Sequence, residues 1–288
     1  TDELGTLSRS LDTMAQNLDQ ALKSLRSANA KLKDEMEQER ELERRRMEFF
    51  AAASHELKTP VTILKGQIEG MEQNVGVYKD RDKYLARARE VTVTLQNMVQ
   101  EILMISKMES CGFSLKKKEL DLAELVRLQL ADLTELFEQK NMKLEITLPD
   151  QCLCRADPVL METVLRNVLV NAVRYSPENE RICVKLYKEL QKISCEDCQA
   201  ISGSSAAASG PKDTALVIME IENTGVHIEE TELSRVFDAF YRADSSRNRK
   251  SGGSGLGLAI VRTIVQRNRG EISVSSTVGK GTVFTVTF

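Results

Sequence analysis

The most constraining feature of the chain is a stripe of apolar and small residues in its first third. Successive members of the stripe are three or four positions apart: Leu4, Leu7, Leu11, Met14, Leu18, Ala21, Leu25, Ala28 and Leu32. This is the heptad spacing of a coiled coil, in which one face of a long helix packs against a partner. Between Asp34 and Glu48, 11 of 15 residues are charged, so the stripe is interrupted by a segment that is typical of a solvated helix face.

Two further apolar stripes follow, separated by the polar turn "GVYKDRD". The first consists of Phe50, Leu57, Leu64 and Met71, interleaved with Ser54, Val61, Ile68 and Val75. The second consists of Tyr84, Ala88, Val91, Leu95, Met98, Ile102 and Ile105. Two such helices form a hairpin with an exposed apolar seam that one chain alone cannot cover. Because two copies can cover it by forming a four-helix bundle, we expect a homodimer.

The pattern changes from about residue 118 onward. Strand-like segments occur at "MKLEITL", "RICVKLY", "ALVIMEI", "EISVSS" and "TVFTVTF", and helix-like segments near 121–140, 158–175 and 256–268. Asp157 followed by Pro158 is a favourable helix start, since an N-cap acceptor precedes a proline at the first helical position. Strands and helices are mixed without strict alternation, which favours a two-layer α/β sandwich over a doubly wound sheet.

Composition excludes several classes of protein. The 288 residues suit one large or two ordinary domains with an appendage, and a net charge of −3 gives no basic field for nucleic acid. No window has the roughly 18 apolar residues of a membrane span. Since the chain begins at Thr1 without a methionine, we expect a fragment of a longer protein whose missing N-terminal segments could hold membrane spans.

The six cysteines favour reduced thiols over a metal or disulfide site. Cys195 and Cys198 have the C-x-x-C spacing of a redox or zinc-knuckle motif, but no second such pair and no nearby histidine completes a site. Both lie in "SCEDCQAISGSSAAASGP", whose composition is that of a polar, flexible loop.

His55, in "SHELKTP", is one of only two histidines in the chain. At about 100° per residue it falls roughly 140° from Phe50, on the outer face of the bundle. A zinc protease motif needs a second histidine four positions on, where Thr59 stands, so that class is excluded. What remains is either an ordinary exposed His-Glu pair or a nucleophilic imidazole whose tautomer Glu56 fixes.

Two other motifs have polar or glycine-rich character in apolar surroundings. "VLRNVLVNAVRYSP" places Asn167 and Asn171 one helical turn apart, and amide oxygens of this kind suit Mg²⁺. "SGGSGLGLAIV" is a glycine-rich loop that leads into an apolar helix, where backbone N–H groups can approach phosphates. It fits neither the Walker loop nor the Rossmann fingerprint.

These motifs together carry a resemblance. "SHELKTP", "NVLVNAVRY", "ENTGVHI", "VFDAFYR", "GGSGLGLAIV" and "GKGTVFTV" occur in this order and resemble the H, N, G1, F, G2 and G3 boxes of bacterial two-component sensor histidine kinases. "DELGTLSRSLDTMAQNL" is similar to the second half of a HAMP signal-relay module. "FFAAASHELKTP" and "FYRADSSRNRKSG" are similar to segments of the sensor kinases of vancomycin-type glycopeptide resistance.

The resemblance implies a domain order. It implies half of a HAMP module at 1–18, a coiled-coil signalling helix at 19–48 and a dimerisation and histidine phosphotransfer domain at 49–112. A catalytic ATP-binding domain of the GHKL type would occupy 118–288. The expected fold class is therefore α plus α/β, with a helical hairpin that dimerises into a four-helix bundle and a two-layer sandwich.

The resemblance also implies roles for residues. His55 would accept the γ-phosphoryl group of ATP with Glu56 as base, and pass it to an aspartate on a response regulator. Thr59 would serve a phosphatase activity, and Asn171 and Asn167 would hold Mg²⁺. Phe237 and Phe240 would anchor a lid from about Gly225 to Gly255, unless they are ordinary core aromatics. The residues implied to contact ATP are Asn167, Asn171, Arg174, Tyr175, Asn223, Gly225, Gly253, Gly255, Leu256, Gly257 and Thr282, with Gly279 and Gly281 near the adenine.

The G1 box departs from the family pattern, with Asn223 at the position of an aspartate and His227 at that of a glycine. Asparagine keeps a carbonyl acceptor for the adenine amino group but loses the charge. A dimeric signalling scaffold or phosphatase with a degenerate ATP site is therefore the alternative. A GHKL ATPase of the chaperone or mismatch-repair kind would share the ATP site but has no reason to carry the heptad hairpin.

Overall fold

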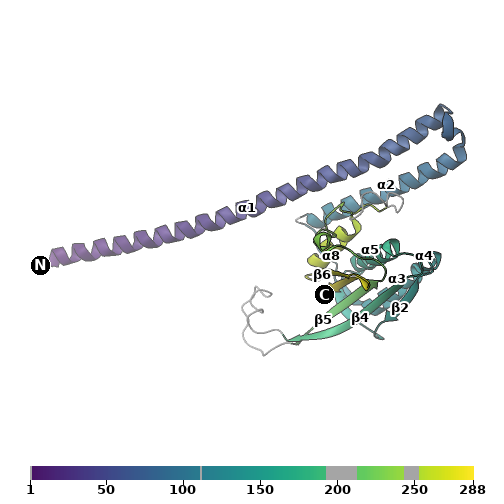
Figure 1. Ribbon diagram of the computed structural model, residues 1–288. Coiled ribbons are helices and arrows are strands. Elements are labelled where there is room, and N and C mark those ends of the chain that lie inside the picture. The colour runs from purple at the N-terminus through teal and green to yellow at the C-terminus, as the bar shows by residue number, and fades with distance from the viewer. Residues whose placement is uncertain (1, 111, 193–212, 243–252) are drawn as a thin grey trace. The chain divides into compact units, whose positions relative to one another are not determined.

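The computed structural model describes residues 2–110, 112–192, 213–242 and 253–288 (Figure 1). Cys111, Cys195 and Cys198 lie outside these residues, as do most of the Ser/Ala/Gly-rich loop and part of the expected lid. The chain divides into two compact units, Thr1–His55 and Glu56–Phe288. Among the described residues, no helix is both long and apolar enough to cross a membrane.

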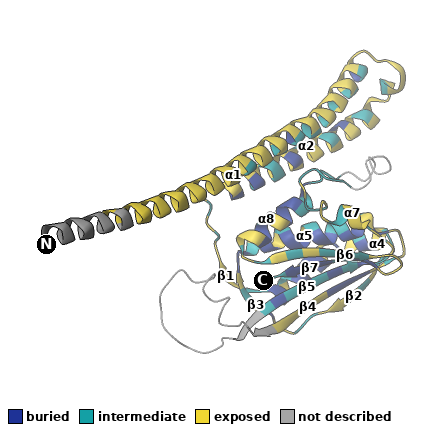
Figure 2. Ribbon diagram, turned by 60° about the vertical axis from the view of Figure 1, so that its left-hand side comes forward, coloured by how far each residue is buried: buried dark blue, intermediate teal, exposed yellow. Residues whose placement is uncertain are grey.

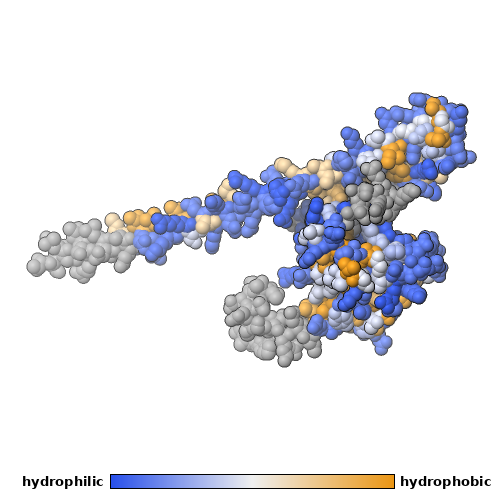
Figure 3. Space-filling view, viewed as in Figure 1, coloured by the Kyte–Doolittle hydropathy of each residue, from blue (hydrophilic) through white to orange (hydrophobic). Residues whose placement is uncertain are grey.

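Helix α1, Asp2–Glu72, contains the expected heptad segment. Met14, Leu18, Leu25 and Leu32 are exposed on it, and apolar patches interrupt an otherwise hydrophilic surface (Figure 3). The charged interval is held by local ion pairs, in which Glu41 accepts from both Arg44 and Arg45. These two guanidinium groups lower the pKa of Glu41 to about 2. The charged run is thus a solvated helix face, as expected.

The hairpin is completed by a short 3₁₀ turn, Gly76–Lys79, and helix α2, Arg81–Glu109. The turn is packed by aromatic rings: Tyr78 lies 4.6 Å from Tyr84, centroid to centroid, and directly against Gly70. A Cβ on Gly70 would be 2.4 Å from the Tyr78 ring, which explains a glycine inside a helix. Asp80 caps α2 by accepting from the Lys83 amide.

The apolar stripe of the first hairpin helix divides into two faces. Met71 is buried and Leu57 and Leu64 are half-buried, whereas Val61 and Ile68 are exposed. Phe50, expected in the same seam as Leu57, is 51% exposed in the single chain. On α2, Ala88, Met98, Ile105 and Met108 are buried. One chain therefore covers one apolar face of the hairpin and leaves a second one in solvent.

The remaining chain forms the expected two-layer sandwich (Figure 2). A five-stranded sheet has the order β2-β4-β5-β7-β6, in which β2 and β4 are parallel and the other pairs antiparallel. Its strands are β2 Lys143–Thr147, β4 Arg181–Lys192, β5 Asp213–Asn223, β6 Glu271–Thr277 and β7 Gly281–Thr287. The short strands β1, Lys118–Asp121, and β3, Leu153–Ala156, form a separate antiparallel pair that the sequence did not predict.

One face of the sheet is covered by helices, among which α5, Pro158–Tyr175, and α8, Gly257–Arg267, pack on one another (Figure 2). The other helices are α3 Leu122–Asp132, α4 Thr134–Gln139 and α7 Glu230–Leu233. The core lies between the layers, because alternate strand residues face the helices. Its strand side includes Val184, Leu186, Met219, Ile221, Phe284 and Val286, all buried.

Both ends of α5 are fixed by side chains. Asp157, buried, accepts from the amides of Val159 at 3.2 Å and Lys116 at 3.0 Å, so the predicted N-cap is confirmed. At the other end, the Lys140 ammonium donates to three carbonyls, those of Val173, Arg174 and Ser176, at 2.8–2.9 Å. A cation at a helix C-terminus satisfies carbonyls that have no partner within the helix and complements the helix dipole.

Lys140→Met should therefore destabilise the sandwich while keeping the aliphatic part of the side chain. Three carbonyls lose a charged donor, so we expect the free energy of unfolding to fall by about 1–3 kcal/mol. The measurement is calorimetric unfolding of the full chain. Lys143→Met, at an exposed position on β2, is the matched control, and an equal loss in both variants would contradict the capping role.

Candidate active site

Helix α5 combines a buried stripe with a polar edge. Its buried residues are Leu160, Met161, Val164, Leu165, Val168, Leu169, Ala172 and Val173. Asn167, Asn171 and Arg174 are half-buried beside that stripe, and Tyr175 at the end of the helix is exposed. The Asn167 amide nitrogen donates to the Thr163 carbonyl at 2.8 Å, which leaves the amide oxygen to face away from the helix backbone.

The glycine-rich segment lies directly against this polar edge. A Cβ on Gly253 would lie 2.6 Å from Nη1 of Arg174, and a Cβ on Gly257 would lie 2.7 Å from Oδ1 of Asn167. A side chain at either position would have to displace one of these groups, which is easier for the end of the flexible Arg174 side chain than for the Asn167 amide. The two motifs, about 90 positions apart in the chain, therefore form one surface of backbone amides, a guanidinium group and an amide oxygen.

Gly255 is the one of the three glycines whose nearest neighbours are backbone atoms. Its φ is +75°, and its carbonyl accepts from the Phe240 amide at 2.9 Å. A Cβ there would lie 2.9 Å from the Cα of Phe240, so backbone would have to move. Leu256, fully buried, follows it, and α8 begins at Gly257. The loop is thus held on one side by α5 and on the other by the segment that contains Phe240.

The two phenylalanines expected to anchor a lid have different environments. Phe237 packs edge-on against the buried ring of Phe284 at 6.4 Å, as a core aromatic does. Phe240 has a φ of +64° and contacts Gly255 through its backbone. Beside them, the Tyr241 hydroxyl donates to Glu232, and burial together with that carboxylate raises the pKa of Tyr241.

Asn223, at the end of β5, is opposite Thr282 of β7 in the sheet register, and both are buried. The Thr282 hydroxyl donates to the Val226 carbonyl at 3.0 Å and lies 2.9 Å from the Ser276 hydroxyl. Asn223 is only 3% exposed, and its amide nitrogen donates to the Ser176 hydroxyl at 3.4 Å. Its amide oxygen has no hydrogen-bond partner in the part of the chain that the structure describes. A buried acceptor in that condition indicates a place for a ligand donor.

The loop after Asn223 is shaped by two glycines. Gly281, with φ +119°, lets the β7 backbone approach the Asn223 carbonyl, which a Cβ would meet at 2.3 Å. Gly225 has φ +78° and lies against the Glu180 carboxylate, which accepts from Thr224 at 2.6 Å. Gly279 also has positive φ, but open space surrounds it. His227 is exposed, with Nδ1 3.3 Å from the Ser276 hydroxyl, and so belongs to this loop rather than to a catalytic group.

His55, Glu56 and Thr59 lie on α1. His55 and Thr59 are exposed, whereas Glu56 is half-buried and Ala53, two residues before His55, is buried. His55 therefore lies on the outer face of the hairpin helix, as its angular position predicted. The helix continues through Pro60, which has no N–H to donate to the Glu56 carbonyl.

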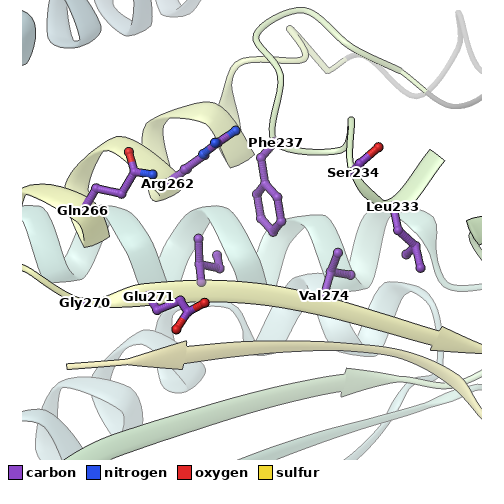
Figure 4. Close-up of a pocket in the computed structure, with 9 residues that line it drawn as sticks. Leu233, Ser234, Phe237, Arg262, Gln266, Gly270, Glu271 and Val274 are labelled. Carbon is purple, nitrogen blue, oxygen red and sulfur yellow. The ribbon is translucent and has the colours of Figure 1, made fainter. Parts of the chain in front are cut away.

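One described cavity lies elsewhere. It has a volume of about 480 Å³ and lies between α7, α8 and β6 (Figure 4). Its walls include Phe237 together with Leu233, Arg262, Glu271 and Val274, and none of the residues expected to contact ATP. The candidate site is therefore located by the chemistry of the glycine segment and of Asn223 rather than by this cavity.

Comparison with known families agrees with these motifs. Residues 45–111 match the family described as "His Kinase A (phospho-acceptor) domain". Residues 156–288 match "Histidine kinase-, DNA gyrase B-, and HSP90-like ATPase". The chain belongs to the sensor histidine kinases. The ATPase family match covers α5, the glycine segment, Asn223 and Thr282, and identifies this part of the chain as an ATP-binding domain.

Curated relatives include sensor protein VanSB of Enterococcus faecalis, which is 34% identical over 261 residues, 91% of this chain and 52% of the relative. Sensor histidine kinase YclK of Bacillus subtilis is 31% identical over 286 residues, 99% of this chain and 52% of the relative. The chain thus spans about half the length of these relatives. The resemblance to glycopeptide-resistance kinases is supported by the first of them.

Two solved structures share the fold. Histidine kinase AdeS of Acinetobacter baumannii superposes with a TM-score of 0.59 at 24% identity, over 81% of this chain and 96% of that one. Histidine kinase ThkA, in complex with response regulator protein TrrA, gives a TM-score of 0.62 at 23% identity, over 84% of this chain and 60% of that one. The helical hairpin followed by an α/β sandwich is therefore the fold of this family.

Sequence reasoning missed three residues that shape the site: Lys140, Ser176 and Glu180. Lys140 caps the helix that carries Asn167 and Arg174, Ser176 contacts Asn223, and Glu180 contacts Gly225. Each is an ordinary polar residue next to an element boundary. Ser176 directly follows the asparagine helix, so the sequence could have predicted that it lies at the end of that helix. The sequence contained no such signal for Lys140 or Glu180.

The glycine contacts predict a rank order of substitutions. Gly253→Ala meets the end of a flexible arginine side chain, which can move, whereas Gly255→Ala meets backbone and requires a left-handed φ. We expect Gly255→Ala to weaken ADP binding more than tenfold, and Gly253→Ala to weaken it about threefold or less. The measurement is calorimetric titration with ADP. Gly66→Ala, which adds a Cβ in open space on α1, is the control, and equal effects of the first two variants would refute the ranking.

Proposed function

We propose that the chain autophosphorylates His55 from Mg-ATP and passes the phosphoryl group to an aspartate on a response regulator. The observation that carries the proposal is the contact of the glycine segment with α5. It brings the Gly253 backbone beside the Arg174 guanidinium group and the Gly257 backbone beside the Asn167 amide. ATP needs these groups, namely positive charge and N–H donors at its phosphates and an acceptor for its base. The unpartnered oxygen of Asn223 supplies the acceptor.

The residues also fit Mg²⁺, which prefers oxygen ligands and binds few protein groups. The Asn167 amide is oriented by its bond to Thr163, so its oxygen faces Gly257. Asn171 follows one turn later on the same edge of α5. We assign both as the protein ligands of Mg²⁺, which would neutralise phosphate charge when bound. Tyr175 and Arg174 would lie beside the phosphates.

In the proposed reaction, one ring nitrogen of His55 forms a bond to the γ-phosphorus as the bond from that phosphorus to the bridging oxygen breaks. ADP leaves with the electron pair of the broken bond. Glu56 accepts the proton of the other ring nitrogen, so the phosphorylated ring is neutral. In the second step an aspartate oxygen of the regulator bonds to the same phosphorus as the bond from that phosphorus to the His55 nitrogen breaks. Glu56 returns the proton, and His55 leaves as a neutral imidazole.

We also propose that Thr59 orients a water molecule that hydrolyses the phosphoryl-aspartate of the regulator. Thr59 is exposed one helical turn after His55, on the face that a docked regulator would meet. A response regulator as partner is supported by histidine kinase ThkA, which was solved in complex with response regulator protein TrrA.

The proposed organisation has half of a HAMP module at 1–18, a signalling helix at 19–48, the phosphotransfer hairpin at 49–112 and the ATP-binding domain at 118–288. The last boundary is supported by α3, which begins at Leu122 within the sandwich unit and is capped by Asp121. We also propose that the chain is part of a membrane-anchored protein, because residues 2–18 resemble the second half of a HAMP module.

A homodimer is proposed from the second apolar face of the hairpin. Val61 and Ile68 on α1 and Val99 and Leu103 on α2 are all more than 40% exposed, and Leu103 is 62% exposed. A four-helix bundle buries such faces at about 25 cal/mol per Å² of apolar surface, which favours association of two hairpins. The exposed heptad residues before the hairpin would extend the same interface.

The second candidate function is a scaffold or phosphatase with a weak ATP site, and Asn223 is the observation that favours it. Its amide is neutral, so it attracts the adenine amino group less strongly than a carboxylate does. Asn167, Asn171 and the three glycines nevertheless keep the contacts that phosphate and Mg²⁺ binding needs. We therefore favour the kinase.

Incubation with Mg²⁺ and γ-labelled ATP tests the kinase directly. The native chain should take up label that is acid-labile and alkali-stable, and His55→Gln and Asn171→Ala should each lose at least 99% of it, since one removes the nucleophile and the other a metal ligand. His227→Gln is the matched control because it removes the only other histidine. If the native chain bound ATP but took up no label, the scaffold or phosphatase would be the better-supported function.

The dimer is tested by sedimentation velocity. Leu103→Glu places a charge in the proposed interface and should shift the native dimer to monomer at micromolar concentration, because a buried unpaired carboxylate costs several kcal/mol. Val278→Glu, at an exposed position on the sandwich, should leave the dimer unchanged. A native monomer, or a dimer that tolerates Leu103→Glu, would contradict the interface.

A further inference from the structure

We propose that Ser176 determines purine specificity by fixing the amide orientation of Asn223. This inference rests on the proposed function, since it assumes that the base of a nucleotide meets the unpartnered oxygen of Asn223. It assigns a positioning role to Ser176, which lies just beyond the last turn of α5 and is 2% exposed.

An asparagine side chain presents an acceptor on one side and a donor on the other, and the two orientations have nearly the same shape. An aspartate has no such ambiguity, because both of its oxygens accept. With Asn223 in this position, the site reads a purine amino group only if the amide oxygen faces the ligand. Some neighbour must therefore hold the amide nitrogen on the other side.

Ser176 is that neighbour. Its hydroxyl donates to the Ala172 carbonyl at 2.7 Å, so its single proton is already used and only lone pairs remain for Asn223. The Asn223 amide nitrogen donates to that oxygen at 3.4 Å. At this distance the bond is long, so it affects orientation more than stability.

The opposite orientation of the amide is disfavoured by the same geometry. It would place the Asn223 oxygen against a hydroxyl oxygen whose proton points to Ala172, unless the hydroxyl gave up its 2.7 Å bond. It would also leave the amide nitrogen without the acceptor that it has now. A buried donor without an acceptor is costly, so Ser176 selects one orientation of two.

The position of Ser176 is itself fixed from the backbone. Its amide donates to Ala172 at 3.1 Å, and its carbonyl accepts from Lys140 at 2.9 Å. The hydroxyl oxygen is therefore held by the helix end and by the lysine that caps it. The amide oxygen of Asn223 remains buried and unpartnered in the described part of the chain, as the group that would read the base.

Adenine and hypoxanthine differ at the atom that this acceptor would meet. Adenine carries an amino group at C6, which donates a hydrogen bond, whereas hypoxanthine carries an oxygen, which accepts. A fixed acceptor accordingly favours ADP over IDP, and an amide that can turn over accommodates either. Neither ligand is hydrolysed in the assay, so binding is measured apart from phosphoryl transfer.

The experiment is calorimetric titration of the full chain with ADP and with IDP. We expect the native chain to prefer ADP at least tenfold, and Ser176→Ala to reduce the preference to threefold or less, mainly through tighter IDP binding. Asn223→Asp should keep the ADP preference both alone and together with Ser176→Ala, because a carboxylate needs no orientation. Unfolding midpoints of all variants check that each is folded.

The outcomes separate this inference from the proposed function. Failure of the native chain to bind either nucleotide would overturn the ATP site itself. An ADP preference that Ser176→Ala leaves intact, or that falls equally in the Asn223→Asp background, would overturn the role of Ser176 alone. Equal binding of ADP and IDP by the native chain would by itself overturn the proposed role of Ser176.

Discussion

The close contact between α5 and the start of α8 is the constraint on which the site depends. Three glycines of the loop lie so close to α5 and Phe240 that a methyl group would clash there. The position of the loop therefore depends on the absence of side chains at these glycines. The helix they approach is held at both ends, by Asp157 and by Lys140, and cannot shift without losing those bonds. A phosphate-binding surface of backbone amides needs this precision, because an amide that moves by an ångström no longer donates to the same oxygen.

The hairpin and the sandwich differ in how their apolar surfaces are covered. The sandwich buries the stripe of α5 against strands and α8 within one chain, so its core is closed. The hairpin buries Met71 and Met98 but leaves Ile68 and Leu103 exposed. An apolar face of that kind is stable only when something covers it. His55 lies on the exposed side of the same helix, so covering the apolar face does not bury it.

Much of this could be predicted from the sequence because the decisive signals are local. Heptad spacing gave the long helix and the hairpin, and Asp157 with Pro158 located the start of α5 to the residue. The alternating strands also lay where expected. The short β1–β3 pair was missed, since four-residue strands carry too little alternation to be recognised.

The contacts that the sequence could not predict are those made across the fold. Lys140 reaches carbonyls more than 30 positions away, and Ser176 meets Asn223 at a separation of 47. The division of the hairpin stripe into a covered and an exposed face was also missed. A spacing of three and four shows that a face is apolar, but only the register of the second helix decides which residues it covers.

The uncharged residue Asn223 stands where the family pattern has an aspartate, and this changes which neighbouring groups determine selectivity. A carboxylate selects the amino group of adenine by charge, whatever surrounds it. An amide has no charge and two orientations, so selectivity passes to the group that holds its nitrogen. In this chain that group is a serine whose own proton is committed to the helix end. On the proposed role of Ser176, base specificity would depend on the geometry of the α5 terminus, and hence on the Lys140 cap of the helix that carries Asn167 and Arg174.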